Sequence, residues 1–314
     1  MLSVPTSEPE SPAVAQGPSS EWALAHLSDL HLSDPLLDPA ATLAGKQLLG
    51  RTSWHKRRRH IHKLAVLDAL SADLLAQAPS QIAISGDLVQ IGLAQEFEQA
   101  ARWLSRFAPA SQVVLVPGNH EAYAAGTWQR GRDHWGPYLA QPPDGEPWLL
   151  RRGRLALIGL SSAVPSWPGM ATGTLGKGQL AALEAALVQG AQEQRFRVVV
   201  VHHPPAGVVS WRKRLTDQRQ FAAIIARHGA GVILHGHTHC ATLSSLRGPS
   251  GPVPVVGVPS ASALDPRPGR MAGYGLLSIT SSDEGWKLRL GRRVYRPQTQ
   301  DCGWLEHCQL PTQG

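Results

Sequence analysis

Short segments rich in histidine and acidic residues recur where apolar, strand-like runs give way to loops. Residues 82–85 form such a run, and Gly86 and Asp87 follow it. The other four segments are Asp29-Leu30-His31, Gly118-Asn119-His120-Glu121, His202-His203-Pro204 and Gly236-His237-Thr238-His239. Open α/β sheets gather functional groups at the carboxyl ends of their strands. We therefore expect an α/β fold in which these segments meet at one edge.

Helical patterns alternate with the strand-like runs. Leu64, Leu67, Leu70 and Leu74 recur at helical spacing in a helix predicted over residues 53–77, with Ser53 as its N-cap. The remaining predicted helices cover 94–107, 177–192 and 218–228, and the predicted strands cover 21–28, 82–85, 113–116, 155–160, 197–201 and 231–234. This order predicts right-handed βαβ units, followed by antiparallel strands over 253–296.

The folded domain is expected over residues 21–296. Residues 1–20 have neither a basic nor an apolar stretch, so we expect a disordered tail that is not a signal peptide, and a loose tail over 297–314. A basic insert occupies 32–63, and an irregular, tryptophan- and proline-containing stretch at 122–154 is predicted to form a cap loop over the site.

Composition indicates a soluble globular protein in a reducing compartment. The chain is 42% hydrophobic and 17% charged, and its three cysteines form no disulfide framework. Its apolar stretches are shorter than the roughly 18–20 residues of a membrane-spanning helix. We therefore expect the protein to be in the cytoplasm, either free or in peripheral contact with the inner face of the membrane.

The five segments supply the oxygen and imidazole donors that two metal ions require. Residues two apart point the same way on an extended chain, so Asp29 with His31, and His237 with His239, are each predicted to bind a single ion. The full set of candidate ligands is Asp29, His31, Asp87, Asn119, His202, His237 and His239.

With these motifs, residues 22–240 resemble the calcineurin-like metallophosphoesterases of the bacterial phosphodiesterase and phosphohydrolase type. The resemblance implies a four-layer α/β/β/α sandwich of two mixed sheets, and two divalent or trivalent metal ions (Mn, Fe or Zn). It implies that a metal-bridging hydroxide attacks phosphorus in line while His120 assists the leaving group. The implied ligands are Asp29, His31 and His239 for the first metal, Asp87 as the bridge, and Asn119, His202 and His237 for the second.

Several neighbouring residues have less certain roles. The family usually has Asp where this chain has Glu121, whose carboxylate we expect to orient the imidazole of His120. His203 is expected to pack or to contact substrate, and His26 to be structural. His235 is either a donor to a metal ligand or a buried histidine with its own partners.

The substrate is less constrained than the reaction. A phosphodiesterase is the favoured interpretation. A cyclic-nucleotide phosphodiesterase is an alternative, weakened because Tyr123 stands where those enzymes often have Arg. A non-catalytic metal-binding scaffold is disfavoured because no ligand is missing.

A membrane-surface pyrophosphate hydrolase is another alternative. Leu43, Leu48, Leu49 and Trp54 lie beside the cations of residues 51–63, which suits contact with anionic lipid through 43–63, and the region loosely resembles hydrolases of the lipid A precursor UDP-diacylglucosamine. An ordinary amphipathic helix explains the same residues. We expect a small phosphate ester or a lipid-linked substrate as partner and not nucleic acid, because the basic residues lack an aromatic stacking ladder. The oligomeric state is left open.

Overall fold

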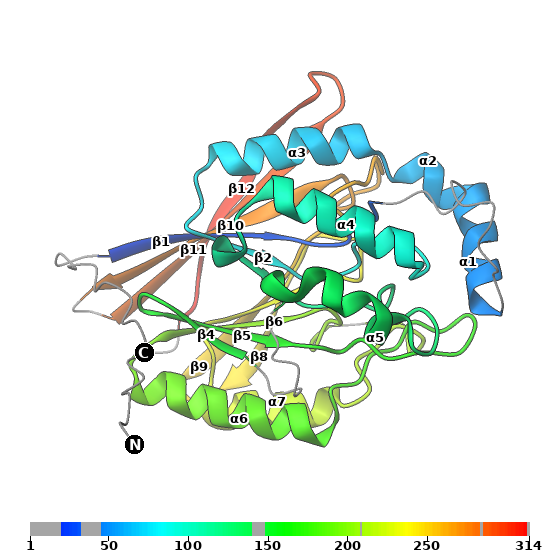
Figure 1. Cartoon of the computed structure of the whole chain (residues 1–314). Helices are drawn as coiled ribbons and strands as arrows, with labels where there is room; N and C mark the ends of the chain where they lie inside the picture. The colour runs from blue at the N-terminus through cyan, green and yellow to red at the C-terminus, as the bar shows by residue number, and fades with distance from the viewer. Residues whose placement is uncertain (1–19, 33–44, 140–147, 208, 283–284, 313–314) are drawn as a thin grey trace, which may run out of the picture.

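Two six-stranded mixed sheets lie face to face, and helices cover both outer faces (Figure 1). The computed structural model describes residues 20–32, 45–139, 148–207, 209–282 and 285–312. The expected four-layer α/β/β/α sandwich is therefore confirmed. The expected tail over 1–20 and part of the basic insert, 33–44, lie outside the described residues, apart from Ser20 in the first strand.

The first sheet has the strand order β12-β11-β10-β1-β2-β3. Strands β1, β2 and β3 are parallel, and β10, β11 and β12 continue the sheet in antiparallel pairing. The bounds are β1 Ser20–Leu27, β2 Gln81–Ile84, β3 Val113–Leu115, β10 Gly273–Ser282, β11 Gly285–Arg296 and β12 Asp301–Leu310. Helices α3 (Leu64–Ala76) and α4 (Ala94–Phe107) cover its outer face, and the short helix η2 (Ala110–Gln112) precedes β3 (Figure 1).

The second sheet has the order β4-β5-β6-β7-β9-β8. Strands β5, β6, β7 and β9 are parallel, while β4 and β8 are antiparallel edges. The bounds are β4 Trp148–Arg152, β5 Leu155–Leu160, β6 Phe196–Val201, β7 Val232–His235, β8 Thr242–Gly248 and β9 Gly251–Gly257. Helices α6 (Gly176–Gln192) and α7 (Gln218–His228) cover its outer face (Figure 1).

Three apolar cores separate the four layers. Along β6, Val198 and Val200 face the core between the sheets, whereas Val199 faces the core under α6 and α7. The third core joins the first sheet to α3 and α4. Each fully buried side chain of this kind contributes roughly 1.5–3 kcal/mol. Because successive residues face different cores, a one-residue slip would turn each set toward the wrong core, and the register that places the strand ends is therefore fixed.

Three of the described strands were absent from the sequence-based expectations. The expected loose tail over 297–314 is wrong, because β12 pairs with β11 along most of its length. Strand β8 lies between the last histidine motif and β9, and β4 lies inside the stretch expected to be irregular. All three are at sheet edges, where backbone pairing on one side suffices and a long apolar run is not required.

The helix predicted over 53–77 is interrupted. It begins earlier, at α1 (Lys46–Ser53), and continues through the π-helix η1 (Trp54–Arg58) and α2 (Arg59–Ile61). His62 and Lys63 are then extended, with ψ of 122° and 121°. Ser53 is the last residue of α1, and its side chain makes no capping hydrogen bond. The interruption occurs because the loop after β9 bonds to this segment: Lys63 N donates to Ser262 O, and Leu264 N donates to Ile61 O.

The predicted cap loop packs away from the site. Helices α5 (Thr127–Gly131) and η3 (Arg132–Tyr138) lie against α4, where Trp135 Nε1 donates to the carbonyl of Phe97 at 3.0 Å. Among the described residues of 122–154, Tyr123 alone lines the cavity over the strand ends. The expectation of a cap is wrong for these residues, and 140–147 lie outside the described part.

Candidate metal centre

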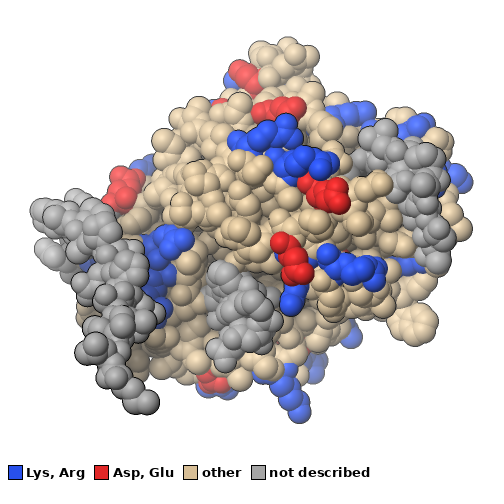
Figure 2. Space-filling model, in the orientation of Figure 1, with Lys and Arg blue, Asp and Glu red and all other residues tan. Residues whose placement is uncertain are grey.

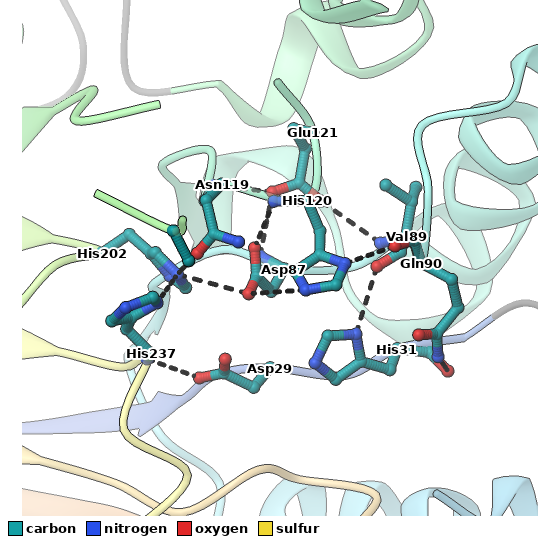
Figure 3. Close-up of polar contacts among 12 residues, drawn as sticks. Asp29, His31, Asp87, Val89, Gln90, Asn119, His120, Glu121, His202 and His237 are labelled. Atoms are coloured by element: carbon teal, nitrogen blue, oxygen red, sulfur yellow. Dashed lines mark hydrogen bonds and ion pairs between the residues drawn. The ribbon is translucent and has the colours of Figure 1, made fainter. Parts of the chain in front are cut away.

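All seven predicted ligands converge beyond the carboxyl ends of the parallel strands. Figure 3 labels all of them except His239. Asp29 follows β1, Asp87 follows β2, Asn119 follows β3, His202 follows β6 and His237 follows β7. His31 and His239 each lie two residues beyond the first member of their motif. The placement expected from open α/β sheets is therefore confirmed.

The donors form two adjoining groups. In the first, His239 Nε2 lies 3.0 Å from Asp29 Oδ1 and 3.3 Å from His31 Nε2. In the second, His202 Nε2 lies 3.2 Å from both Asn119 Oδ1 and His237 Nδ1. Asp87 belongs to both groups. Its carboxylate lies close to the ligand atoms of Asp29, His31 and His239 in the first group, and its Oδ2 is 3.3 Å from His202 Nε2 in the second.

The donor set fits metal cations. His31 Nδ1 lies 3.1 Å from the carbonyl oxygen of Val89, which only accepts, so this nitrogen carries the proton and Nε2 presents its lone pair to the cluster. Burial lowers the pKa of His31 well below its usual value. Asp29 Oδ1 is buried, and its polar contact within the described residues is the one with His239 Nε2, at 3.0 Å, itself a predicted ligand atom. A cation between such groups would satisfy these lone pairs. A carbonyl behind the imidazole, as Val89 supplies for His31, is typical of metal-bound histidines.

The second group also favours positive charge. His202 Nδ1 lies 2.6 Å from the carbonyl oxygen of Ser85. Burial lowers the pKa of His202, but the Asp87 carboxylate outweighs burial and raises it to about 9. The charge of Asp87 that stabilises a proton here is the same charge that would hold a metal ion.

Left-handed backbone conformations direct most of the ligand side chains toward the metal centre. The prediction that each paired motif is extended is wrong: the side chains converge because the chain turns sharply at each ligand. A residue in this conformation costs of order 1–3 kcal/mol and persists where its surroundings hold it, as at functional sites. Five of the ligands have positive φ: Asp29 (54°), His31 (48°), Asp87 (57°), His237 (66°) and His239 (49°).

Hydrogen bonds between loops hold these conformations. Asp29 N donates to Gly86 O at 2.9 Å, and His31 N donates to Asp87 O at 3.0 Å. His237 N donates to Asp29 Oδ2 at 2.9 Å. Gly236 permits this contact, because a Cβ there would lie 2.5 Å from the same Oδ2 atom.

His120 lies beside Asp87 and His31 without being one of the seven donors, and its ring centroid is 4.8 Å from that of His31. Its backbone N donates to Asp87 Oδ1 at 2.8 Å, and its Nε2 is 3.9 Å from Asp87 Oδ2. Nδ1 contacts the carbonyl of Gln90, and Arg58 Nη1 lies 3.4 Å from Nε2. Burial lowers the pKa of His120 to about 3, opposed by Asp87 and reinforced by Arg58. The free imidazole is therefore neutral, with its Nε2 lone pair toward Arg58.

Glu121 does not orient His120, contrary to expectation. Its Oε1 accepts from the backbone N–H groups of Leu88 and Val89, at 2.8 and 3.2 Å. Its Oε2 accepts from Asp87 N at 2.9 Å and Gly118 N at 2.6 Å. The longer Glu side chain thus clamps the loop after β2 to the loop after β3, and the Gln90 carbonyl orients the imidazole instead (Figure 3).

The remaining histidines of the motifs have structural partners. His203 is buried, with Nδ1 2.7 Å from Ser162 Oγ and Nε2 3.2 Å from Ala171 O. His235 contacts the carbonyl of Gly236 and the hydroxyl of Thr242, so it is a buried histidine with its own partners. His26 Nε2 lies 2.9 Å from Ser85 Oγ, as expected for a structural residue.

An open cavity of about 610 Å³ lies over the donors. Arg57 and Arg58 belong to the basic run, for which lipid contact or an ordinary amphipathic helix was expected; the other cations, Lys46 of α1 and four residues from loops, were missed because no recognisable motif contains them. His62 also lines the cavity and was not recognised as a site residue, although it stands in the basic run. The cationic lining residues are Lys46, Arg57, Arg58, Arg212, Lys213, Arg267 and Arg270.

Comparison with known proteins agrees with this arrangement. A family model described as calcineurin-like phosphoesterase matches residues 23–241. A search of curated proteins found no match. A dimetal phosphatase from Danio rerio is 11% identical with a TM-score of 0.59, and the match covers 93% of this chain and 99% of that one.

Two longer proteins share the fold. A purple acid phosphatase from yellow lupin seeds is 12% identical, with a TM-score of 0.59, and the NAD nucleotidase of Haemophilus influenzae is 14% identical, with a TM-score of 0.51. Each match covers 92% of this chain but only 53% and 54% of those chains. The chain thus spans about half the length of these two proteins, and the likeness is one of fold.

Proposed function

Because the chain belongs to the calcineurin-like phosphoesterase family and is a metal-dependent phosphoester hydrolase, we propose that its substrates are phosphate diesters. The donors described above would hold two metal ions, which supply Lewis-acid charge and an activated water when bound. The finer choice of substrate rests on the cavity around them.

Cations from separate segments surround the donor cluster, and this observation carries the proposal. Lys46, Arg57 and Arg58 come from the basic insert, whereas Arg212 and Lys213 come from the loop between β6 and α7. Arg267 is neutralised by Asp265, at 2.5 Å. A monoester has one substituent and would use one side of this cavity, whereas both substituents of a diester would find room and polar contacts.

The protein's own groups then have distinct tasks. Arg58 lies beside His120 and would contact a non-bridging phosphate oxygen, since guanidinium groups match phosphate geometry. An anionic phosphate close to His120 raises its pKa, so the imidazole can take up a proton at Nε2 and deliver it to the leaving oxygen. The Gln90 carbonyl accepts a hydrogen bond from Nδ1–H and keeps the ring in place throughout.

Hydrolysis of paired nitrophenyl esters tests the proposal. Purified protein loaded with Mn²⁺ is assayed with bis-p-nitrophenyl phosphate and with p-nitrophenyl phosphate, and the diester should have the higher kcat/KM. A higher value for the monoester would overturn the diester proposal while leaving the family assignment in place. Cyclic nucleotides belong in the same panel, because they are diesters with one leaving group tethered.

A lipid-linked pyrophosphate is a second candidate substrate, supported by apolar side chains at the cavity mouth. Leu48 and Leu49 of α1 are 55% and 57% exposed, and Trp167 and Trp211 are 84% and 61% exposed. Lys46 Nζ donates to Ser166 Oγ at 2.8 Å, and Ala171 N donates to Arg212 O, so the three segments are adjacent. Apolar tips next to cations suit insertion at an anionic lipid surface.

The distribution of charge favours this local contact over a broad basic face. On the side shown in Figure 2, basic and acidic side chains are interspersed over the described surface. No helix in the described ranges has the length and apolar character needed to cross a bilayer.

Vesicle sedimentation tests the second candidate. The protein should sediment with vesicles containing anionic phosphatidylglycerol and stay in solution with neutral phosphatidylcholine. The double variant Leu48→Gln/Trp211→Ser should lose most of this binding, whereas Leu305→Gln, which changes an exposed leucine on β12, should not. If the wild-type protein stays in solution with both kinds of vesicle, the membrane proposal is excluded. UDP-diacylglucosamine is then no more favoured as a substrate than other phosphate esters.

A further inference from the structure

His62 is brought into the site by the interruption between α2 and α3. The residue is 8% exposed and its backbone forms an isolated bridge with Ala263. The bonds from Lys63 N to Ser262 O, at 2.9 Å, and from Leu264 N to Ile61 O, at 2.8 Å, flank this bridge. The helical break therefore anchors His62 between two segments instead of leaving it on a helix surface.

The ring of His62 is held among the first group of donors. Its centroid lies 4.5 Å from that of His31 and 5.6 Å from that of His239. The indole of Trp54 stacks on its other side, 6.4 Å away and inclined by 14°. One potential ligand nitrogen of each of His31, His62 and His239 lies within 4.8 Å of the others. Three imidazoles at this separation can share one ion.

A chain of hydroxyl groups sets the protonation of the ring. Ser260 Oγ donates to the carbonyl of Asp29 at 2.6 Å, so its oxygen is left to accept. Ser262 Oγ lies 3.4 Å from Ser260 Oγ and can donate to it, and it then accepts from His62 Nδ1 at 2.9 Å. In this arrangement Nδ1 carries the proton and Nε2 carries the lone pair.

A lone pair at Nε2 favours a cation over an anionic substrate. A phosphate oxygen would be repelled by it, whereas a neutral imidazole is a common metal ligand. Metal-bound histidines usually donate the far ring N–H to a carboxylate, a backbone carbonyl or water, and here Ser262 Oγ is the acceptor for His62 Nδ1.

We propose that His62 is an eighth protein ligand, joining Asp29, His31, Asp87 and His239 at the first metal. The basic insert would then help to build the metal centre as well as the cavity wall. This proposal rests on the metal centre alone and not on the diester preference. Measurements of metal binding therefore test it separately from the substrate assignment.

Cobalt titration of the full chain is the first test. Metal-free protein is titrated with Co²⁺ by calorimetry, and the visible absorption of the bound ion is recorded. His62→Ala should weaken one of the two sites by at least about tenfold, since even residues behind a ligand affect affinity by 10–100-fold. The visible bands should change with the coordination number. The matched control His60→Ala, an exposed histidine two residues away in α2, should leave both sites and the spectrum unchanged.

Two outcomes would overturn the proposal. The first is a folded His62→Ala protein that retains both dissociation constants and the wild-type spectrum. The second needs no variant: crystals of the wild-type protein loaded with Zn²⁺ should show Nε2 of His62 about 2.0–2.1 Å from the first ion. A separation too long for a bond, with the ion present, would make His62 a packing residue.

Discussion

The carboxylate of Glu121 accepts a hydrogen bond from the backbone N–H of Asp87 at 2.9 Å, while the carboxylate of Asp87 accepts one from the backbone N–H of His120 at 2.8 Å. The loops after β2 and β3 are thus tied reciprocally. One tie positions the carboxylate shared by the two donor groups, and the other positions the imidazole beside it. Glu121 therefore acts on the site through the backbone.

Glu121→Gln should destabilise the protein although its shape is retained. Both oxygens of Glu121 accept backbone N–H groups, and the Gln amide would turn an N–H donor toward two of them. A buried unsatisfied polar group costs roughly 1–3 kcal/mol, so we expect a loss of at least about 2 kcal/mol in the free energy of unfolding. Urea denaturation of the metal-free protein measures it; an unchanged midpoint would contradict the clamp.

Asp87→Ala and His120→Ala should separate metal binding from catalysis. Asp87→Ala removes the carboxylate common to both donor groups, so metal content and hydrolysis of bis-p-nitrophenyl phosphate should be lost together. His120→Ala should keep both metals and lower kcat by about 10²–10⁴-fold, the usual contribution of a general acid. Metal analysis of the purified variants decides. Retained activity in Asp87→Ala, or lost metal in His120→Ala, would reverse the two assignments.

Lys46 should make substrate binding depend on pH. Burial lowers the pKa of Lys46 to about 8, opposed by Asp87 and reinforced by Arg58. Below pH 8 the ammonium group is charged and attracts an anionic ester; above pH 8 the charge is lost, so KM should rise. In Lys46→Arg the charge persists, and KM should stay flat from pH 7 to pH 9.5. Parallel KM profiles for the two proteins would show that Lys46 does not contact the substrate.

Gly236→Ala should disturb the metal centre by crowding Ser28 and Asp29. The added Cβ would overlap the hydroxyl of Ser28 and lie 2.5 Å from Asp29 Oδ2, the atom that accepts the bond from His237 N. We expect weaker binding of at least one metal and an overpacking cost of about 1–3 kcal/mol. Calorimetric metal titration and thermal unfolding measure the two effects. Gly178→Ala, at a helical glycine with open space around it, is the control.

The parts of the fold that the sequence predicted well are those whose buried residues follow a regular pattern: one face of helices α4 and α7, and the whole of strand β5. Helices α4 and α7 and strand β5 have the predicted bounds, because their apolar residues directly record which face is buried. Edge strands such as β12 bury little, and their backbone pairing leaves a weak mark in the sequence. The ligand motifs were visible because five strand ends carry the same unusual residue types in order.

The geometry of the site was harder to predict. The left-handed turns at residues such as Asp29 and His237 depend on bonds between distant loops, which no local pattern records. His62 was missed for the same reason: helical spacing continues on both sides of it, and only the contact with Ser262 reveals the break. Glu121 was recognised as a departure, but its role required knowledge of which N–H groups it faces.

Strand β1 lies between β2 and β10, and β10 comes much later in the sequence. Strand β1 is therefore synthesised long before its second neighbour exists. Asp29, just beyond β1, accepts from His237, 208 positions later. During translation the early donors therefore emerge without the histidines that complete their group. Metal loading must follow synthesis of the late strands, and the ions that the finished protein acquires depend on the metal pool it meets after translation, because this mixed N/O donor set accepts several metals.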